Sequence, residues 1–427
     1  MMTNTYLPHV GGVARSVATF ATALRRRGHD VMIVAPTFDG SPPREADVLR
    51  LPALQRFNGS DFSVRLPIPG LLYNSLEKFQ PQIIHTHHPF LLGDTALRTA
   101  VRRELPLVFT HHTMYERYTH YVPGDSHAMQ QFVARLATEY ANLCDHVIAP
   151  SQSIEKILRQ RDVNSPISSI PTGVDVDLFA QGCGRRTREK LHIPPDAFVL
   201  GHVGRLAPEK NLELLSRIAI AFLKRRVDAH FLVAGSGPSS DLIQASFHEH
   251  GLSGRLHLVG TLQGQALVDA YHAMDVFAFA SMTETQGMVL AEALAGGVPV
   301  IAIDAPGVRE IVVDRVNGRL LGTQEPQVFL EALHELAGLS RAQAAALAAA
   351  ARTSAAAFGV DRCTDRLAGV YQGLIDAEAP ARHPADHDPW MQALRLVEAE
   401  WNLWNGRTDA ALRSLKRPGR KTAFEDA

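Results

Sequence analysis

The sequence has few cysteines, almost no net charge and no long apolar run, and each shortage excludes a class of protein. Three of the 427 residues are cysteines. Cys144, Cys183 and Cys363 lie too far apart for a metal-binding motif, which is typical of free thiols in a reducing compartment. The formal net charge at pH 7 is −1. Such a balance gives no basic field, and we expect no nucleic acid partner.

No stretch predicts a transmembrane helix or a secretory signal peptide. The most apolar candidate, residues 342–357, is alanine-rich and interrupted by Arg352, which favours a helix packed on the protein. The N-terminus lacks a charged start followed by an apolar core. We therefore expect a cytoplasmic protein whose contact with a membrane is at most peripheral. The 20 histidines include no His-x3-His pair on a predicted helix, and no metal site is predicted.

Short apolar segments alternate with helical segments over most of the chain. In the first half, strands are predicted at 31–35, 47–51, 82–86, 107–110 and 146–149. In the second half, they are predicted at 198–203, 230–234, 255–259, 276–280 and 298–303. This alternation predicts an α/β protein with mostly parallel sheets in two similar halves. We predict an N-terminal domain over 1–172, a linker over 173–195, a C-terminal domain over 196–360, a helix over 361–377 that packs back toward the first domain, and a link and tail over 378–427.

The N-terminus predicts a helix without a complete strand before it. Gly11 and Gly12 open an amphipathic helix, in which Val13, Val17, Phe20 and Leu24 recur at helical spacing. In an α/β fold, a glycine turn before a helix normally follows a strand. Residues 1–5 are too few and too polar for a full strand, so we expect the first strand of this domain to be clipped.

Residues 281–299 combine a strand end, a glycine-bearing loop and a helix start. Glu284 lies in the loop, and Glu292 lies about one turn into the predicted helix. Free backbone N–H groups at such a helix start can bind an anion. Two carboxylates at different depths around an anion suit a ligand with hydroxyls on both sides of a diphosphate, such as a nucleotide sugar. The spacing alone also fits two solvated glutamates.

Residues 202–210 follow the first strand of the second half. Ligands bind at the carboxyl ends of parallel strands. Arg205 offers a planar guanidinium that can donate two hydrogen bonds side by side, and Lys210 offers a compact ammonium charge. Together they suit a diphosphate and would stabilise it as a leaving group. The alternative is a surface loop with ordinary charges. Residues 231–238 are a strand followed by a Gly-x-Gly turn that begins at Gly235, which is weak evidence by itself.

Histidines gather after two strands of the first half. They lie in His85-Thr-His-His-Pro-Phe90 and in Thr110-His-His-Thr-Met-Tyr-Glu116. A histidine at a strand end can hydrogen-bond a sugar hydroxyl or move a proton. For most of these histidines, a structural role is the better account.

These motifs together resemble those of the family-4 glycosyltransferases over roughly residues 5–377. The likeness depends on Gly-Arg-x4-Lys at 204–210, Glu-x7-Glu at 284–292 and Gly-Val-Pro-Val at 297–300. A narrower likeness is to bacterial diacylglycerol glucosyltransferases. It depends on residues 85–90, on His-Thr-Met-Tyr-Glu-x2-Thr-His-Tyr at 112–121 and on Thr-Glu-Thr-Gln-Gly at 283–287.

The resemblance implies a GT-B fold, in which two Rossmann-like domains face each other across a cleft. It implies a retaining, metal-independent transfer of a hexose to an acceptor such as diacylglycerol. On that basis Asp175-Val-Asp177 is structural, no cofactor is expected, and the donor, a UDP- or GDP-hexose, is a substrate. The alternatives are a soluble or cell-envelope glycan acceptor, a nucleotide-sugar epimerase of the same architecture, and a non-catalytic nucleotide-sugar binder.

The resemblance also implies residue roles. Glu292 would hold the ribose, Glu284 the donor sugar, and Arg205 with Lys210 the diphosphate, while His112 would lie next to the sugar. The predicted catalytic residues are His112, Glu284, Arg205 and Lys210. The predicted donor-binding residues are Gly11, Gly12, Gly204, Gly235, Thr285, Gln286, Gly287, Met288 and Glu292.

Two features concern the acceptor and the membrane. Tyr115, Tyr118 and Tyr121 are three residues apart and could share a face beside an acceptor, although burial in loop packing is more common for such aromatics. The tail contains all three tryptophans and ends in a basic run. It could lie on an anionic membrane or pack as a helix on the domains, and the sequence leaves both open.

Overall fold

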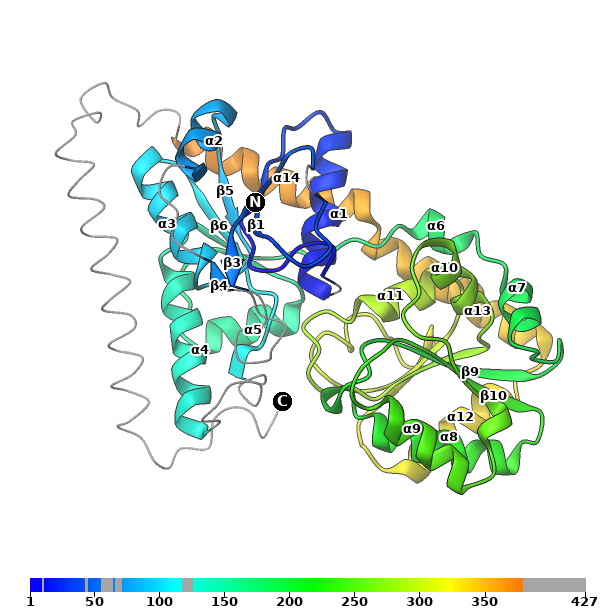
Figure 1. Ribbon diagram of the computed structural model, residues 1–427. Helices are drawn as coiled ribbons and strands as arrows, with labels where there is room; N and C mark the ends of the chain where they lie inside the picture. Colours follow the sequence, from blue (N-terminus) through cyan, green and yellow to red (C-terminus); the bar gives the residue numbers. More distant parts are fainter. Residues whose placement is uncertain (10, 43–44, 55–63, 66–70, 117–125, 379–427) are drawn as a thin grey trace. The chain divides into compact units, whose positions relative to one another are not determined.

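The computed structural model describes residues 1–9, 11–42, 45–54, 64–65, 71–116 and 126–378. The chain forms two compact units, which are shown in Figure 1. Unit 1 consists of Met1–Gly173 together with Asp361–Ala427, and unit 2 is Val174–Val360. Unit 2 is thus continuous in sequence, whereas unit 1 is assembled from two separate stretches.

Unit 1 is built on a parallel sheet. Its strands are β1 (Ile33–Pro36), β2 (Val48–Leu51), β5 (Ile84–Thr86), β6 (Leu107–Thr110), β7 (His146–Ala149) and β8 (Ile167–Ser169), and a short antiparallel pair joins β3 (Ala53–Leu54) to β4 (Val64–Arg65). Its helices are α1 (Gly12–Arg26), α2 (Leu71–Phe79), α3 (Leu92–Arg103), α4 (His127–Asn142), α5 (Gln152–Gln160) and the returning α14 (Val360–Glu378). β1 pairs with β2, and β5 to β8 pair in chain order.

The N-terminal segment occupies the place of the strand that the sequence predicts to be clipped. Met2 forms parallel bridges to Val34 of β1 on one side and to Thr86 of β5 on the other. The backbone N–H of Met2 donates to His85 O at 2.8 Å, and Val34 N–H donates to Met1 O at 2.8 Å. The segment joins the two groups of parallel strands into one sheet.

Helix α14 completes the core of unit 1. Its residues Cys363 and Leu367 are fully buried and pack against Phe20 of α1 and Val108 of β6. The guanidinium of Arg27 donates to Asp365 at 2.9 Å, which ties α14 to the end of α1. A segment that follows unit 2 in sequence therefore belongs to the hydrophobic core of unit 1.

Unit 2 has a six-stranded, fully parallel sheet in the order β11-β10-β9-β12-β13-β14. The strands are β9 (Phe198–Val203), β10 (Ala229–Ala234), β11 (Leu256–Leu258), β12 (Val276–Phe279), β13 (Val300–Ile303) and β14 (Gly318–Leu321). The helices are α6 (Val176–Ala180), α7 (Gly184–Lys190), α8 (Leu212–Arg225), α9 (Ser240–Glu249), α10 (Gly264–His272), α11 (Met288–Ala295), α12 (Pro326–Ala337) and α13 (Arg341–Ala355), with 3-10 turns η3 (Pro208–Lys210), η4 (Ser253–Arg255) and η5 (Ala356–Phe358).

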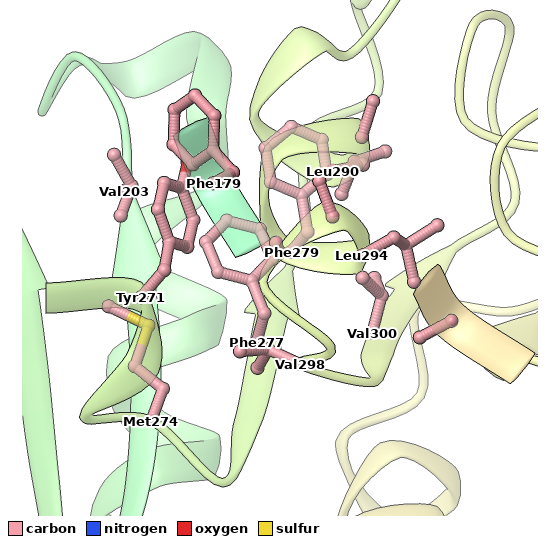
Figure 2. Packing of buried hydrophobic residues seen from close by; sticks show 14 of the residues in the cluster. Phe179, Val203, Tyr271, Met274, Phe277, Phe279, Leu290, Leu294, Val298 and Val300 are labelled. Carbon is pink, nitrogen blue, oxygen red and sulfur yellow. The ribbon is translucent and has the colours of Figure 1, made fainter. Parts of the chain in front are cut away.

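Helices cover both faces of this sheet, with α8, α9 and α12 on one face and α10, α11 and α13 on the other (Figure 1). Because both faces are covered, the strands are apolar at successive positions: Val199 packs on one face and Leu200 on the other. Figure 2 shows one face from close by, with Leu290 and Leu294 of α11 packed in the same cluster as Phe279. Burying a side chain of this size contributes about 1.5–3 kcal/mol, so this packing holds α11 against the sheet.

The predicted linker, residues 173–195, contains two short helices, α6 and α7. Phe179 of α6 is buried and contacts Tyr271 of α10 edge-on, with ring centroids 5.6 Å apart. Both helices are therefore part of unit 2. Within the described ranges, no helix is both long enough and apolar enough to cross a bilayer.

Candidate functional site

The predicted residues of unit 2 gather where the strand order of its sheet reverses. β9 and β12 are neighbours, yet the chain runs from β9 outward to β10 and β11, and from β12 outward to β13 and β14. The loops after two such strands leave in opposite directions, and open α/β sheets bind ligands there. Residues 204–210 follow β9, and residues 281–287 follow β12. The topology therefore brings both predicted motifs to one edge of the sheet.

Gly204 and Gly235 end the adjacent strands β9 and β10 and allow two loops to touch. Gly204 N–H donates to Ala234 O at 3.0 Å. A Cβ atom on Gly235 would lie 1.8 Å from Gly204 O, and the φ of Gly235 is +150°. A side chain at this position would therefore push the two loops apart. Arg205 follows directly and is exposed on the same loop.

Lys210 and Glu284 form an ion pair between the two loops, from Lys210 Nζ to Glu284 Oε1. Their side chains retain 17% and 15% of their exposure. Burial alone would raise the pKa of Glu284, but the charge and hydrogen bond of Lys210 hold that pKa below its ordinary value of 4.5. Ser281 also joins the loops, since its Oγ donates to Glu209 O at 3.3 Å. The structure thus places the predicted phosphate cation and the predicted sugar-binding carboxylate in direct contact.

The start of α11 depends on Gly287. This residue has left-handed backbone angles (φ 71°, ψ 47°) and is the N-cap of the helix. A Cβ atom on Gly287 would lie 2.9 Å from Leu290 Cδ1. Thr285 and Gln286 precede it, and Met288 is the first helical residue, so the predicted backbone contacts all belong to this turn. Gly307 after β13 packs on the same turn, because a Cβ there would lie 2.7 Å from Gln286 N.

Glu292 lies one turn into α11 and is 1% exposed. The hydroxyl of Tyr271 donates to Glu292 Oε2 at 2.8 Å. Tyr271 itself is fully buried in α10. Its contact with Glu292 holds the carboxylate in one orientation. Sequence reasoning missed Tyr271, because it is one apolar-face residue of an ordinary amphipathic helix and carries no motif.

His202 is a second residue that the sequence analysis did not single out. It lies in β9, is fully buried, and its Nδ1 donates to the carbonyl oxygen of Ala278 at 3.0 Å. Burial lowers its pKa to about 4, with a further contribution from the charge of Lys210. The ring lies beside those of Phe277 and Phe279, with its centroid 6.1 Å from each. His202 is therefore a neutral imidazole within the packing beneath the Lys210–Glu284 pair.

In unit 1, the predicted residue His112 is hydrogen-bonded to His87, with His87 Nδ1 2.9 Å from His112 Nε2. His85 Nε2 bonds Thr110 Oγ1 at 2.7 Å, and Asn4 N–H donates to His88 Nδ1 at 3.1 Å. Burial lowers the pKa of His112 and of His88 to about 3. The histidines after β5 and β6 are thus neutral at pH 7.

The remaining predicted residues of unit 1 lie at the start of α1. Gly11 is its N-cap, and Gly12 is its first residue. A Cβ atom on Gly12 would meet nothing within 4 Å, so packing gives no reason for glycine there. Tyr115 is described, whereas Tyr118, Tyr121 and the tryptophan-containing tail lie outside the described residues. Asp175 of the Asp-x-Asp motif is the N-cap of α6, since its side chain accepts from Leu178 N–H at 3.0 Å.

Two family models match the chain. "Glycosyltransferase Family 4" matches residues 10–178, and "Glycosyl transferases group 1" matches residues 185–353. An alpha-monoglucosyldiacylglycerol synthase of Streptococcus pneumoniae is 30% identical over 75% of this chain and 74% of its own. A GDP-mannose-dependent alpha-mannosyltransferase of Mycolicibacterium smegmatis is 30% identical over 88% of this chain and 97% of its own. A D-inositol 3-phosphate glycosyltransferase of Xylanimonas cellulosilytica is 30% identical over 88% of this chain and 93% of its own.

Solved structures resemble the whole described fold. Sucrose-phosphate synthase from Thermosynechococcus elongatus matches with a TM-score of 0.72 and 22% identity, over 88% of this chain and 99% of its own. HepE from Anabaena, solved in complex with UDP and glucose, matches with a TM-score of 0.68 and 21% identity, over 87% and 99%. Together with the two parallel sheets, this likeness shows the GT-B fold, with two Rossmann-like halves.

Proposed function

The chain belongs to the family-4 glycosyltransferases, and from that premise we propose that it moves a hexose from a UDP- or GDP-linked donor to a membrane lipid such as diacylglycerol, with retention of configuration. The observation that carries the site assignment is the contact between Lys210 and Glu284 at the edge where β9 and β12 end. At this place, the cation suits the diphosphate of a nucleotide sugar, and the carboxylate suits the hydroxyls of its hexose.

Each group of unit 2 has a proposed role in donor binding. Glu292, held by Tyr271, accepts hydrogen bonds from the ribose hydroxyls. Glu284 accepts from hydroxyls of the hexose. Lys210 and Arg205 neutralise the diphosphate, and the backbone N–H groups at the turn before α11 contact its oxygens. Donor binding therefore requires Lys210 to divide its charge between Glu284 and a phosphate oxygen.

The transfer step uses the same groups. The bond between the anomeric carbon and the diphosphate oxygen breaks, and a bond from the acceptor oxygen to that carbon forms on the same face. The acceptor proton passes to an oxygen of the departing diphosphate, so no separate base is required. Lys210 and Arg205 stabilise the negative charge that develops on that diphosphate. No metal or cofactor takes part in this proposal.

The lipid acceptor is proposed from the likeness of the sequence at 85–90 and 112–121 to diacylglycerol glucosyltransferases, and from the synthase of S. pneumoniae among the relatives. A soluble acceptor is the second candidate, because a D-inositol 3-phosphate glycosyltransferase is equally identical over more of the chain. An epimerase would convert the donor without any acceptor, so product analysis separates it from both.

The test begins with donor hydrolysis by the full-length protein, using UDP-glucose, UDP-galactose and GDP-mannose. The preferred donor is then supplied with vesicles that contain diacylglycerol, with vesicles that lack it, or with soluble polyol phosphates. Transfer that depends on diacylglycerol supports the proposal, with Lys210→Ala as the inactive control. Transfer to a soluble acceptor alone would overturn the lipid assignment.

Sedimentation with anionic vesicles, with and without residues 389–427, tests whether the tail supplies the peripheral membrane contact. Equal sedimentation of the two proteins rules out the tail as that contact.

A further inference from the structure

Two histidines from different strands of unit 1 are hydrogen-bonded to each other. His87 follows β5 and is fully buried, and His112 follows β6 and is partly buried. Their ring planes are 23° apart and their centroids 5.1 Å apart, and Nδ1 of His87 lies 2.9 Å from Nε2 of His112. A hydrogen bond between two neutral imidazoles needs one N–H donor and one lone-pair acceptor. The two rings therefore cannot choose their tautomers independently.

Both rings are held in the neutral form. Burial lowers the pKa of each histidine, and for His87 the neighbouring imidazoles and the N-terminal amino group lower it further. The ring of His85 lies 4.2 Å from that of His87, measured between centroids, and is itself fixed by hydrogen bonds to Thr110 and Tyr371. The pair therefore has two arrangements, which differ in which ring donates the shared proton.

The other nitrogen of His87 decides between them. His87 Nε2 is buried and has no hydrogen-bond partner among the described residues. If His112 donated, His87 Nε2 would carry a proton and would be a buried N–H without an acceptor. If His87 donates, the same nitrogen is only an unpaired lone pair. Buried orphan N–H groups are rarer than under-satisfied acceptors, so the second arrangement is favoured.

We infer that His87 is a positioning residue that donates from Nδ1 to His112 Nε2 and thereby fixes His112 in its Nδ1–H tautomer. Toward a sugar nucleotide, His112 then offers an N–H donor and does not act as a proton acceptor. This role toward the substrate rests on the proposed function, whereas the tautomer does not. It agrees with the transfer step above, in which the departing diphosphate takes the proton.

The first test reads the tautomer directly. Protein labelled with 15N-histidine is studied by long-range 1H–15N correlation at pH 7, and the His112 signal is assigned by its loss in His112→Gln. We expect the proton on Nδ1 in the wild type. We expect it to remain there in His87→Asn, whose amide can place an N–H near the former Nδ1. In His87→Asp the only group at that place is an acceptor, and the proton moves to Nε2 of His112.

The second test measures transfer with the best donor and acceptor. His87→Asn should keep most of the activity. His87→Asp and His87→Leu should lower kcat by roughly tenfold with a smaller change in KM, which corresponds to one hydrogen bond. Circular dichroism and thermal melts check that all three variants fold. Rescue by asparagine, but not by leucine, separates positioning from simple packing.

The outcomes distinguish this inference from the proposed function. A wild-type proton on His112 Nε2, or a proton that stays on Nδ1 in His87→Asp, would overturn the inference even if sugar transfer is active. A proton that moves as expected supports the His87–His112 link even if no acceptor is found, and only the proposed function then fails. If the tautomer behaves as expected but His87→Asp retains full kcat, the substrate role of the tautomer is refuted.

Discussion

Removing either member of the Lys210–Glu284 pair should damage both stability and catalysis, and the two effects can be separated. Breaking a fully buried ion pair from one side costs about 3–5 kcal/mol, because a charge is left without its partner. Here the side chains keep 17% and 15% of their exposure, so we take the lower end, about 3 kcal/mol, for Lys210→Met. For a unit of this size, that lowers the Tm of unit 2 by roughly 6–12 °C.

The double variant Lys210→Met/Glu284→Gln is the matched control. It removes both charges, so no unpaired buried charge remains, and we expect it to regain most of the lost Tm. Its transfer rate should nevertheless stay down by roughly 10²–10³-fold, since the cation that stabilises the leaving diphosphate is still absent. Differential scanning calorimetry gives the stabilities, and initial rates at saturating donor give kcat.

Recovery of stability without activity would show that the pair is a functional site as well as a structural contact. Recovery of both in the double variant would refute the catalytic role. The pH dependence gives an independent check. Because the pKa of Glu284 is below 4.5 in the folded protein, the stability from this pair is present above that value and is lost as the pH falls through the folded pKa. The double variant should lack this loss.

Three further predictions follow from the geometry. Tyr271→Phe removes the donor to Glu292 and should raise KM for the nucleotide sugar by roughly fivefold with little change in kcat, as initial rates would show; an unchanged KM would contradict that contact. Gly287→Ala places a Cβ 2.9 Å from Leu290 Cδ1 at a φ of 71°, and it should lower the free energy of unfolding, measured with denaturant, by about 1–3 kcal/mol. The control Gly322→Ala should not lower it, because nothing lies within 4 Å of a Cβ there. His88, His111 and His112 of unit 1, whose pKa is lowered to about 3, bind protons more readily in the unfolded state. The free energy of unfolding of unit 1 should therefore fall by roughly 3 kcal/mol between pH 6.5 and 5.5. A free energy of unfolding that rises on acidification would exclude their burial.

The central strands could be predicted from sequence because they are buried on both faces. The structure has β6, β7 and β9 at the predicted residues, and apart from His146 and His202 each consists of apolar or small residues. β8 and β14 escaped prediction. Ile167–Ser169 is only partly buried, and two of its three residues are serine. Gly318–Leu321 contains Gly318 and Arg319, so neither strand gives an apolar run. A Cβ on Gly318 would lie 1.8 Å from Val300 O, which explains a glycine inside that strand.

Two glycines of the predicted linker, Gly182 and Gly184, lie where elements of unit 2 pack closely. In the structure they allow α7 to pack closely on α10, because a Cβ on Gly182 would lie 2.0 Å from His272 Cδ2, and one on Gly184 would lie 2.0 Å from His272 O. A glycine required by a distant backbone looks the same in sequence as a glycine required by a turn.

The candidate site was predictable in part. The motifs locate Lys210 and Glu284, but their contact joins residues 74 apart, and only the pairing of β9 with β12 brings them together. The link from Tyr271 to Glu292 and the pairing of His87 with His112 likewise depend on how separate elements align. Local patterns carry no such information, so these partners could be found only from the structure.

The return of α14 to unit 1 has a consequence for synthesis on the ribosome. Unit 2 is complete once Val360 has emerged, whereas the core around Phe20 and Val108 stays open until Cys363 and Leu367 arrive. Unit 2 can therefore finish folding before unit 1. A chain that stops after Val360 would release an intact unit 2 attached to an N-terminal half with an uncovered apolar surface, which is a target for proteases and chaperones.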